Sequence, residues 1–116
     1  FGQICSESMG VNQYSGTGGQ VDFTAGSQYN PEGKAFICLK SAAKVDGKLV
    51  SKIVPVLSEG ATVTTLRTDV QYVVTEYGVA QLKGKSLSQR ARELIGIAHP
   101  DFRGELTSEA RRYKII

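Results

Sequence analysis

The chain has 116 residues, of which 41% are hydrophobic and 22% charged, and its formal net charge is +3. These values are typical of one globular domain or part of one. The basic residues form no extended patch of the kind that binds nucleic acid, and no apolar run is long enough to cross a membrane. We therefore expect neither a nucleic-acid partner nor a membrane segment.

Segment 1–5 is short and apolar, as at the end of a strand, and it begins at Phe1 rather than at a methionine. We therefore expect the chain to be a fragment of a longer protein. The two cysteines, Cys5 and Cys38, show no metal-ligand spacing, and Cys38 lies within an apolar run. Both are predicted to be buried, reduced thiols of a cytoplasmic protein, and no metal site is expected.

A glycine-rich stretch follows a predicted loop at 6–12. Segment 15–23 reads Ser-Gly-Thr-Gly-Gly-Gln-Val-Asp-Phe, with three glycines within four positions. Glycine lets a backbone turn sharply and approach a ligand closely. If a helix begins near Gln20, the loop amides face outward and attract negative charge. The stretch lacks the Gly-Lys-Ser/Thr of a Walker phosphate loop. Two interpretations stay open, part of an active site completed elsewhere or a tight turn packed against a sheet.

The first half of the chain is predicted to be mostly strands. A short helix at 21–27, closed by Gly26, and a turn at 29–33 come first. The apolar run 35–41 indicates a strand covered on both faces. Asp-Gly at 46–47 predicts a hairpin. Further strands are expected at Leu49–Leu57, Ala61–Leu66 and Val70–Thr75, the last being the clearest buried strand.

Helices dominate the last third. Segment 79–82 is predicted to form one helical turn. Ser86 and Gln89 have the spacing of a capping box, and the apolar residues from 87 to 98 recur as one stripe of an amphipathic helix. Pro100 ends this helix and opens another. The expected fold class is α/β, with a mixed or mainly parallel sheet flanked by helices and no domain boundary within 1–116.

Five segments, in order, resemble the C-terminal part of the acetyl-CoA hydrolase/transferase family. This family includes 4-hydroxybutyrate, butyrate and succinate:acetate CoA-transferases. Together the segments cover nearly the whole chain: Ser6–Gly10, Ser15–Phe23, Val73–Ala80, Leu82–Leu87 and Ile97–Arg103. The resemblance implies that residues 1–116 form the later half of a CoA-transferase catalytic domain.

The resemblance also implies a reaction. A glutamate carboxylate attacks an acyl-CoA thioester, and the resulting acyl-glutamyl anhydride is converted by the CoA thiolate into an enzyme-CoA thioester. An incoming short carboxylate then reverses the sequence. The family's nucleophilic glutamate lies upstream of the glycine loop, in a part that this chain lacks. CoA is a substrate here, and no other cofactor is implied. Full-length relatives are usually oligomeric, so a homo-oligomer is implied.

Individual residues match the family's site. Gly19 would offer its backbone N–H to the oxyanion and contact CoA, and Gly18 and Ser15 would line the CoA site. Lys44 matches a lysine that contacts CoA, with Lys40 as the competitor because loop lengths vary here. Glu76 matches an acidic residue close to the reacting carboxylates, which it would orient by hydrogen bonds.

Other interpretations of these residues stay beside the functional ones. Glu76 is also explained as a carboxylate at a helix N-terminus, and Lys44 as a solvated lysine before a hairpin. Glu7 precedes the glycine loop but does not lie where the family's nucleophile does. His99 is predicted to cap or pack at a helix boundary. For the whole protein, acyl-CoA hydrolysis is the rival activity, and an inactive CoA-binding fragment or assembly module is the non-enzymatic alternative.

Overall fold

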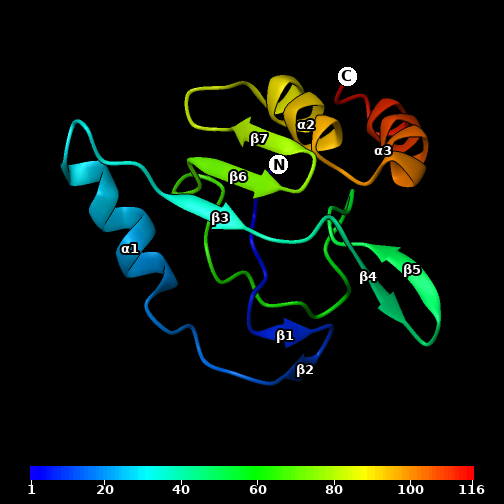
Figure 1. The fold of residues 1–116 in the computed structure, drawn as a ribbon, viewed down its shortest axis with the longest axis horizontal. Helices are drawn as coiled ribbons and strands as arrows, with labels where there is room; N and C mark the ends of the chain where they lie inside the picture. The colour runs from blue at the N-terminus through cyan, green and yellow to red at the C-terminus, as the bar shows by residue number, and fades with distance from the viewer.

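The computed structural model describes residues 1–116, and a three-stranded mixed sheet lies at its centre (Figure 1). The strands are β3 (Phe36–Cys38), β6 (Tyr72–Thr75) and β7 (Gly78–Gln81), in the spatial order β3–β6–β7. Strand β3 runs parallel to β6, and β7 runs antiparallel to it. The predicted α/β class with a mixed sheet is confirmed, although the sheet is small.

Two helices complete the core. Helix α2 (Leu87–Gly96) packs against β7, and α3 (Pro100–Arg112) packs against α2. Both lie above the sheet in Figure 1. The apolar stripe predicted for 87–98 is only partly buried. Ala98 is buried and Leu94 and Ile95 pack half-buried against the core, but Leu87 is exposed. The buried cluster consists of Ile53, Val70, Val73, Ala80, Leu82, Ile97, Ala98 and Leu106.

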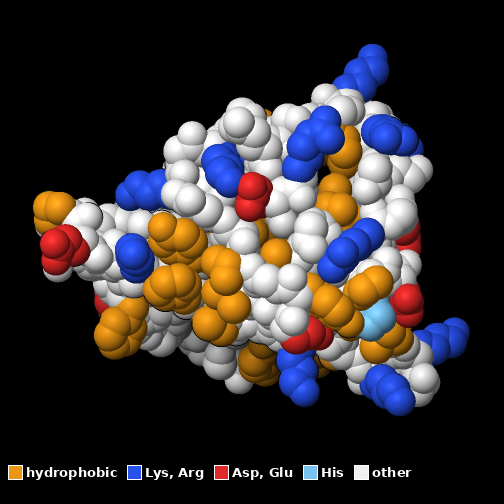
Figure 2. Space-filling view, turned by 45° about the horizontal axis from the view of Figure 1, so that its top comes forward, with side chains coloured by type: hydrophobic (Ala, Val, Ile, Leu, Met, Phe, Trp, Pro, Cys, Tyr) orange, Lys and Arg blue, Asp and Glu red, His pale blue; other side chains and the backbone are white.

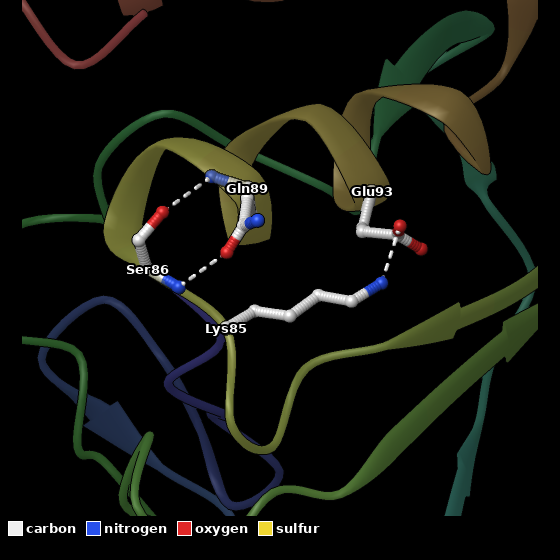
Figure 3. Close-up of polar contacts among 4 residues, drawn as sticks. All are labelled: Lys85, Ser86, Gln89 and Glu93. Atoms are coloured by element: carbon white, nitrogen blue, oxygen red, sulfur yellow. Dashed lines mark hydrogen bonds and ion pairs between the residues drawn. The ribbon is translucent and has the colours of Figure 1, made fainter.

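The predicted capping box at the start of α2 is present (Figure 3). Ser86 Oγ accepts from the backbone N–H of Gln89 at 3.3 Å, and Gln89 Oε1 accepts from the N–H of Ser86 at 2.9 Å. These bonds satisfy two donors that a helix start leaves without an intrahelical partner. Next to them, Lys85 Nζ lies 2.5 Å from Glu93 Oε1. As predicted, Pro100 opens the next helix.

Three segments lie outside the central sheet (Figure 1). A short hairpin pairs β1 (Ser8–Met9) with β2 (Asn12–Gln13), within and just beyond the region predicted as a loop. Helix α1 (Gln20–Gly26), near its predicted bounds, continues into the 3₁₀ turn η1 (Ser27–Tyr29). A second hairpin pairs β4 (Ala42–Val45) with β5 (Lys48–Ser51). Its turn places Asp46 and Gly47 at φ 49° and 77°, the geometry that Asp-Gly predicts.

The helical turn predicted at 79–82 is wrong, because this segment forms β7. Its side chains alternate, with Val79 and Gln81 exposed and Ala80 and Leu82 buried. That alternation is the period of a strand. Gly78 adopts φ +142°, which lets the chain reverse directly after β6.

Two predicted strands are shorter or less regular than expected. The strand predicted at 49–57 is confined to β5. The strand predicted at 61–66 is reduced to one bridge between Thr65 and Ile4. Its hydrogen-bonding groups are used irregularly, because both Thr64 and Thr65 donate their backbone N–H to Ile4 O and the Thr64 side chain accepts from Ser6 N. The segment therefore lies against the N-terminal segment without a ladder.

The prediction of a strand covered on both faces is wrong, because one face of β3 is open to solvent, and the strand also lies at an edge of the sheet. Alternate residues of a strand direct their backbone groups to opposite edges. Ala35 and Leu39 bond to β6, so Phe36 and Cys38 direct theirs away from the sheet. The Phe36 side chain is 52% exposed, and Cys38 is exposed rather than buried. Cys5 is half-buried, and both thiols are free.

The chain exposes much apolar surface. Its accessible surface is 7386 Å², whereas a compact monomer of its mass exposes about 6,200 Å². Phe23 and Tyr29, from α1 and η1, are 81% and 91% exposed. Figure 2 shows hydrophobic side chains gathered left of centre, on the side where Figure 1 places α1 and β3. None of the helices combines the length and hydropathy needed to span a bilayer.

The core predicts a contrast between two leucines. Replacing Leu82, which is fully buried, with alanine should lower the free energy of unfolding by about 3 kcal/mol because it leaves a cavity. Leu87→Ala removes the same atoms from a side chain that is 43% exposed, and should cost about 1 kcal/mol or less. Urea unfolding of the intact protein would measure both. Equal losses would contradict the assignment of Leu82 to the core.

Candidate functional site

The glycine loop, residues 15–19, connects the β1–β2 hairpin to α1 and is exposed throughout. At its start, the backbone N–H groups of Tyr14 and Ser15 both donate to Glu7 O, at 2.9 and 3.3 Å. Beyond its end, Gln20 Nε2 donates to the buried Thr65 hydroxyl at 2.8 Å. The loop is thus held at both ends and free between them. The predicted helix start at Gln20 is confirmed.

The two adjacent glycines of the loop have different requirements. Gly18 has φ +57°, a conformation that costs any residue with a Cβ about 1–2 kcal/mol. Gly19, the residue before α1, has φ −94°, and a Cβ there would come no closer than 3.5 Å to Phe23. The N–H groups of both glycines donate to no group of this chain. The fold itself therefore needs a glycine at 18 but not at 19.

Glu76 directly follows β6, and its carboxylate holds the start of the second hairpin. Its Oε2 accepts from the backbone N–H of Ser41 at 2.9 Å, and its Oε1 accepts from the Ser41 hydroxyl at 2.8 Å. Ser41 is fully buried, although Glu76 is exposed. The hydrogen bond from the Ser41 backbone is the largest of the causes that hold the pKa of Glu76 below its ordinary value of 4.5. At neutral pH this side chain is therefore an anion that accepts hydrogen bonds.

The two candidate lysines lie close to that contact. Lys40 is exposed in the segment between β3 and β4, directly before Ser41. Lys44 is exposed on β4, opposite Leu49 in the hairpin register. Neither ammonium group has a hydrogen-bond or ion-pair partner among the contacts of the chain. Both therefore lie in solvent close to Ser41, the residue that Glu76 holds.

A large open hollow of about 1200 Å³ lies among α1, β3 and the β1 region. Its lining is mainly apolar, and it includes Phe23, Phe36 and both cysteines. Two cations that sequence analysis did not select, Lys34 and Lys52, also line it. Both are at loop positions, which give no sequence signal. They line the same hollow only in the folded chain, because one precedes β3 and the other follows β5.

The predicted site residues do not gather around this hollow. Ser15, Gly18, Gly19, Lys44 and Glu76 are all absent from its lining. The loop between β2 and α1 lies below β3 in Figure 1, whereas the β6–β7 turn lies above it. Within this chain the glycine loop and the Glu76–Ser41 contact are therefore two separate clusters. No group of three or more His, Cys, Asp or Glu side chains has the geometry to hold a metal ion.

His99 has the capping and packing role predicted for it. Its Nδ1 accepts from the backbone N–H of Asp101 at 3.3 Å at the start of α3. Its ring meets Tyr77 and Phe102 edge-on, with centroid distances of 5.6 and 5.9 Å. Arg103 likewise makes a local contact, donating to Ala98 O at 2.9 Å. These contacts account for both side chains without a chemical role.

The family model of the acetyl-CoA hydrolase/transferase C-terminal domain matches residues 1–110, and the chain belongs to this family. It is 60% identical over its whole length to the succinyl-CoA:cyclohexane-1-carboxylate CoA transferase of Geobacter metallireducens, covering 26% of that protein. It is 58% identical over 112 residues to the 4-hydroxybutyrate coenzyme A transferase of Clostridium kluyveri, covering 97% of this chain and 26% of that one.

A solved structure has the same fold. The crystal structure of RipA from Yersinia pestis matches with a TM-score of 0.85 and 43% identity, over 99% of this chain and 25% of RipA. The chain thus spans about a quarter of the length of the proteins that it matches. The resemblance inferred from five sequence segments is confirmed.

The Ser41–Glu76 contact predicts a pH dependence. Because the pKa of Glu76 is lowered in the fold, its stabilisation is complete above pH 4.5 and is lost as the pH falls through the lowered value. The amide chemical shift of Ser41, followed by NMR, should therefore titrate with a midpoint below 4.5. In the Glu76→Gln variant, which keeps an acceptor but does not ionise, the same shift should stay flat. A midpoint at or above 4.5 in the unmodified protein would contradict the assignment.

Proposed function

We propose that this chain is the later part of a CoA-transferase, which moves CoA between an acyl-CoA and a short carboxylic acid. The observation that carries the proposal is family membership over residues 1–110, which includes the whole glycine loop. The names of the two relatives described above support transfer over hydrolysis. Because the family also contains hydrolases by description, hydrolysis is kept as an outcome of the experiment below.

The proposed mechanism is a ping-pong exchange at a glutamate outside residues 1–116. The glutamate oxygen attacks the thioester carbonyl, and the carbon–sulfur bond breaks. The products of this step are the free CoA thiolate and an acyl-glutamyl anhydride. The thiolate then attacks the glutamyl carbonyl and expels the first carboxylate, leaving CoA on the enzyme as a thioester. An incoming carboxylate reverses both steps. Covalent catalysis divides one difficult exchange into easier ones.

Gly19 is the proposed oxyanion donor. Each step develops negative charge on a carbonyl oxygen, and a backbone N–H held in place beforehand stabilises that charge. The Gly19 N–H has no partner in this chain, and the fold has no need of a glycine at this position. Both observations agree with a residue that lies against a ligand. Ser15 and Gly18 are proposed to line the CoA site beside it.

Glu76 is proposed to act near the reacting carboxylates, as an anion. An ionised carboxylate cannot donate a hydrogen bond to another carboxylate, so it would orient such a group only through a shared donor. Ser41, which already donates to Glu76 through both its N–H and its hydroxyl, fixes the carboxylate for this role. Lys44, or Lys40 beside it, is proposed to contact the phosphates of CoA.

The remainder of the polypeptide is the proposed partner of this chain. The chain exposes roughly 1,200 Å² more surface than a compact monomer of its mass. One partner of a standard specific interface buries about 800 Å² of its own surface, so the excess is large enough for such an interface. The unpaired edge of β3 and the exposed aromatic rings of α1 and η1 lie where such a partner would add sheet and core. We propose that the part of the protein carrying the nucleophile covers this side.

The location of the nucleophile is tested by mass spectrometry. The intact protein that contains this chain, mixed with butyryl-CoA, should gain the mass of a CoA thioester, which hydroxylamine removes. After digestion, no peptide from residues 1–116 should carry CoA. CoA on Glu7 or Glu76 would contradict the proposal. Release of the adduct by added carboxylates but not by water would support transfer, whereas release by water alone would identify a hydrolase.

Gly19→Ala tests the oxyanion donor. The methyl group fits the fold but crowds the thioester, so kcat/KM of the intact protein for acyl-CoA should fall about 100-fold with little change in stability. Gly104→Ala makes the same change at an exposed position of α3 with nothing within 4 Å, and should leave activity unchanged. Equal activity of the two variants would remove Gly19 from the site.

A further inference from the structure

Glu7 is a buried carboxylate that the proposed mechanism does not use. It lies directly before β1 and is only 4% exposed. Its Oε1 accepts from Gln13 Nε2 at 2.8 Å, whereas its Oε2 is buried without a partner. A carboxylate held inside the fold in this way cannot reach a substrate. Burial of such a group also opposes folding unless it makes a contact that the protein needs.

That contact passes through Gln13 to the glycine loop. The same Nε2 that donates to Glu7 also donates to Ser15 O at 2.8 Å, so both of its protons are used. Gln13 Oε1 accepts from the Thr62 hydroxyl at 3.1 Å. Because Glu7 Oε1 and Ser15 O are both acceptors, the amide of Gln13 fits in one orientation only.

Glu7 therefore fixes Ser15 in two ways. Its backbone carbonyl accepts the Ser15 N–H, and its side chain, through Gln13, holds the Ser15 carbonyl. Between Ser15 and Gln20 the loop has no further anchor on the rest of the chain. The glycines between them keep their conformational freedom unless the ends of the loop are fixed. Ordering such a loop at the moment of binding would weaken the affinity for a ligand.

We propose that Glu7 and Gln13 form a positioning pair that sets the glycine loop for CoA. The inference rests on the proposed function, because it assigns the loop to the CoA site. The pair touches no reacting atom. It acts through Ser15 by limiting where the loop, and with it the N–H of Gly19, can lie. Misplacing such a donor by about 1 Å is enough to cost roughly 100-fold in rate.

The test compares three variants of the intact protein. Gln13→Met removes both donors at similar length, and should lower kcat/KM for acyl-CoA about 10- to 100-fold. In a ping-pong reaction each substrate has its own kcat/KM. The value for the carboxylate should fall less than that for acyl-CoA, because CoA is by then bound covalently and only the oxyanion donor is affected. Thr62→Val is the matched control. It removes the other contact of Gln13, leaves Glu7 and Ser15 bonded, and should stay within about threefold of the unmodified protein.

Glu7 supplies the conservative rescue. Glu7→Ala should lower kcat/KM as Gln13→Met does. Glu7→Gln keeps an oxygen for Gln13 and places its nitrogen where Oε2 has no partner, so it should restore most of that loss. If Glu7 were only structural, Gln13→Met and Glu7→Ala would lower the melting temperature while kcat/KM per folded molecule stayed unchanged. That result would overturn the proposal.

A second measurement does not depend on activity. The Ser15 amide, which donates to Glu7 O, should exchange its hydrogen faster in Gln13→Met than in Thr62→Val, because only the first change frees this end of the loop. If the unmodified protein neither binds CoA nor turns over an acyl-CoA, the proposed function fails, whatever the exchange data show. If it is active but the Ser15 amide exchanges equally in both variants, the positioning pair is wrong and the proposed function stands.

Discussion

Strand β6 is the constraint on which the rest of the structure depends, because it is the one strand of the central sheet with a neighbour on both edges. Its parallel pairing with β3 brings together segments more than thirty residues apart, with Cys38 opposite Val74. The carboxyl ends of parallel strands lie at the same side of a sheet. Ser41 and Glu76, which follow these two strands, therefore meet, and the β4–β5 hairpin starts from that contact. The antiparallel pairing with β7 in turn directs the chain into α2 and the core.

Outside the central sheet, hydrogen bonds of polar side chains, rather than apolar packing, attach segments to the rest of the chain. Helix α1 buries only Thr24. It is tied to the rest of the chain through Gln20, which donates to the Thr65 hydroxyl. The following turn η1 is tied through Gln28, which donates to Asp69 O at 3.3 Å. Individual hydrogen bonds contribute only about 1 kcal/mol each to stability. Such ties set where a helix and its preceding loop lie more than they set how stable the fold is. Placement of this kind is what a ligand-binding loop needs.

Sequence patterns predicted the features that depend on near neighbours. The capping box of Ser86, the Asp-Gly turn at 46–47, the helix start at Pro100 and the buried strand 70–75 all follow from local chemistry. Four residues at 79–82 were too few to separate a strand from a helical turn. The exposure of Cys38 follows from the open face of β3, on which its side chain lies, and no local pattern shows whether a face is covered. The Ser41–Glu76 and Glu7–Gln13 contacts were not predicted either, because no local pattern contains them. Each joins backbone or side-chain atoms whose meeting is decided by the pairing of strands and hairpins, and glutamine carries no spacing signal.

The open edge of β3 has a consequence for handling this polypeptide. Phe36 and Cys38 point unpaired backbone donors and acceptors outward, with an exposed aromatic ring and a free thiol beside them. Such an edge is a template onto which any extended strand, including β3 of another copy, can add. Residues 1–116 produced alone would therefore be prone to edge-to-edge aggregation. Where Cys38 thiols of two copies become neighbours in such an aggregate, they could cross-link under oxidising conditions. The number of chains in the aggregate would then depend on the redox state of the buffer as well as on the protein concentration.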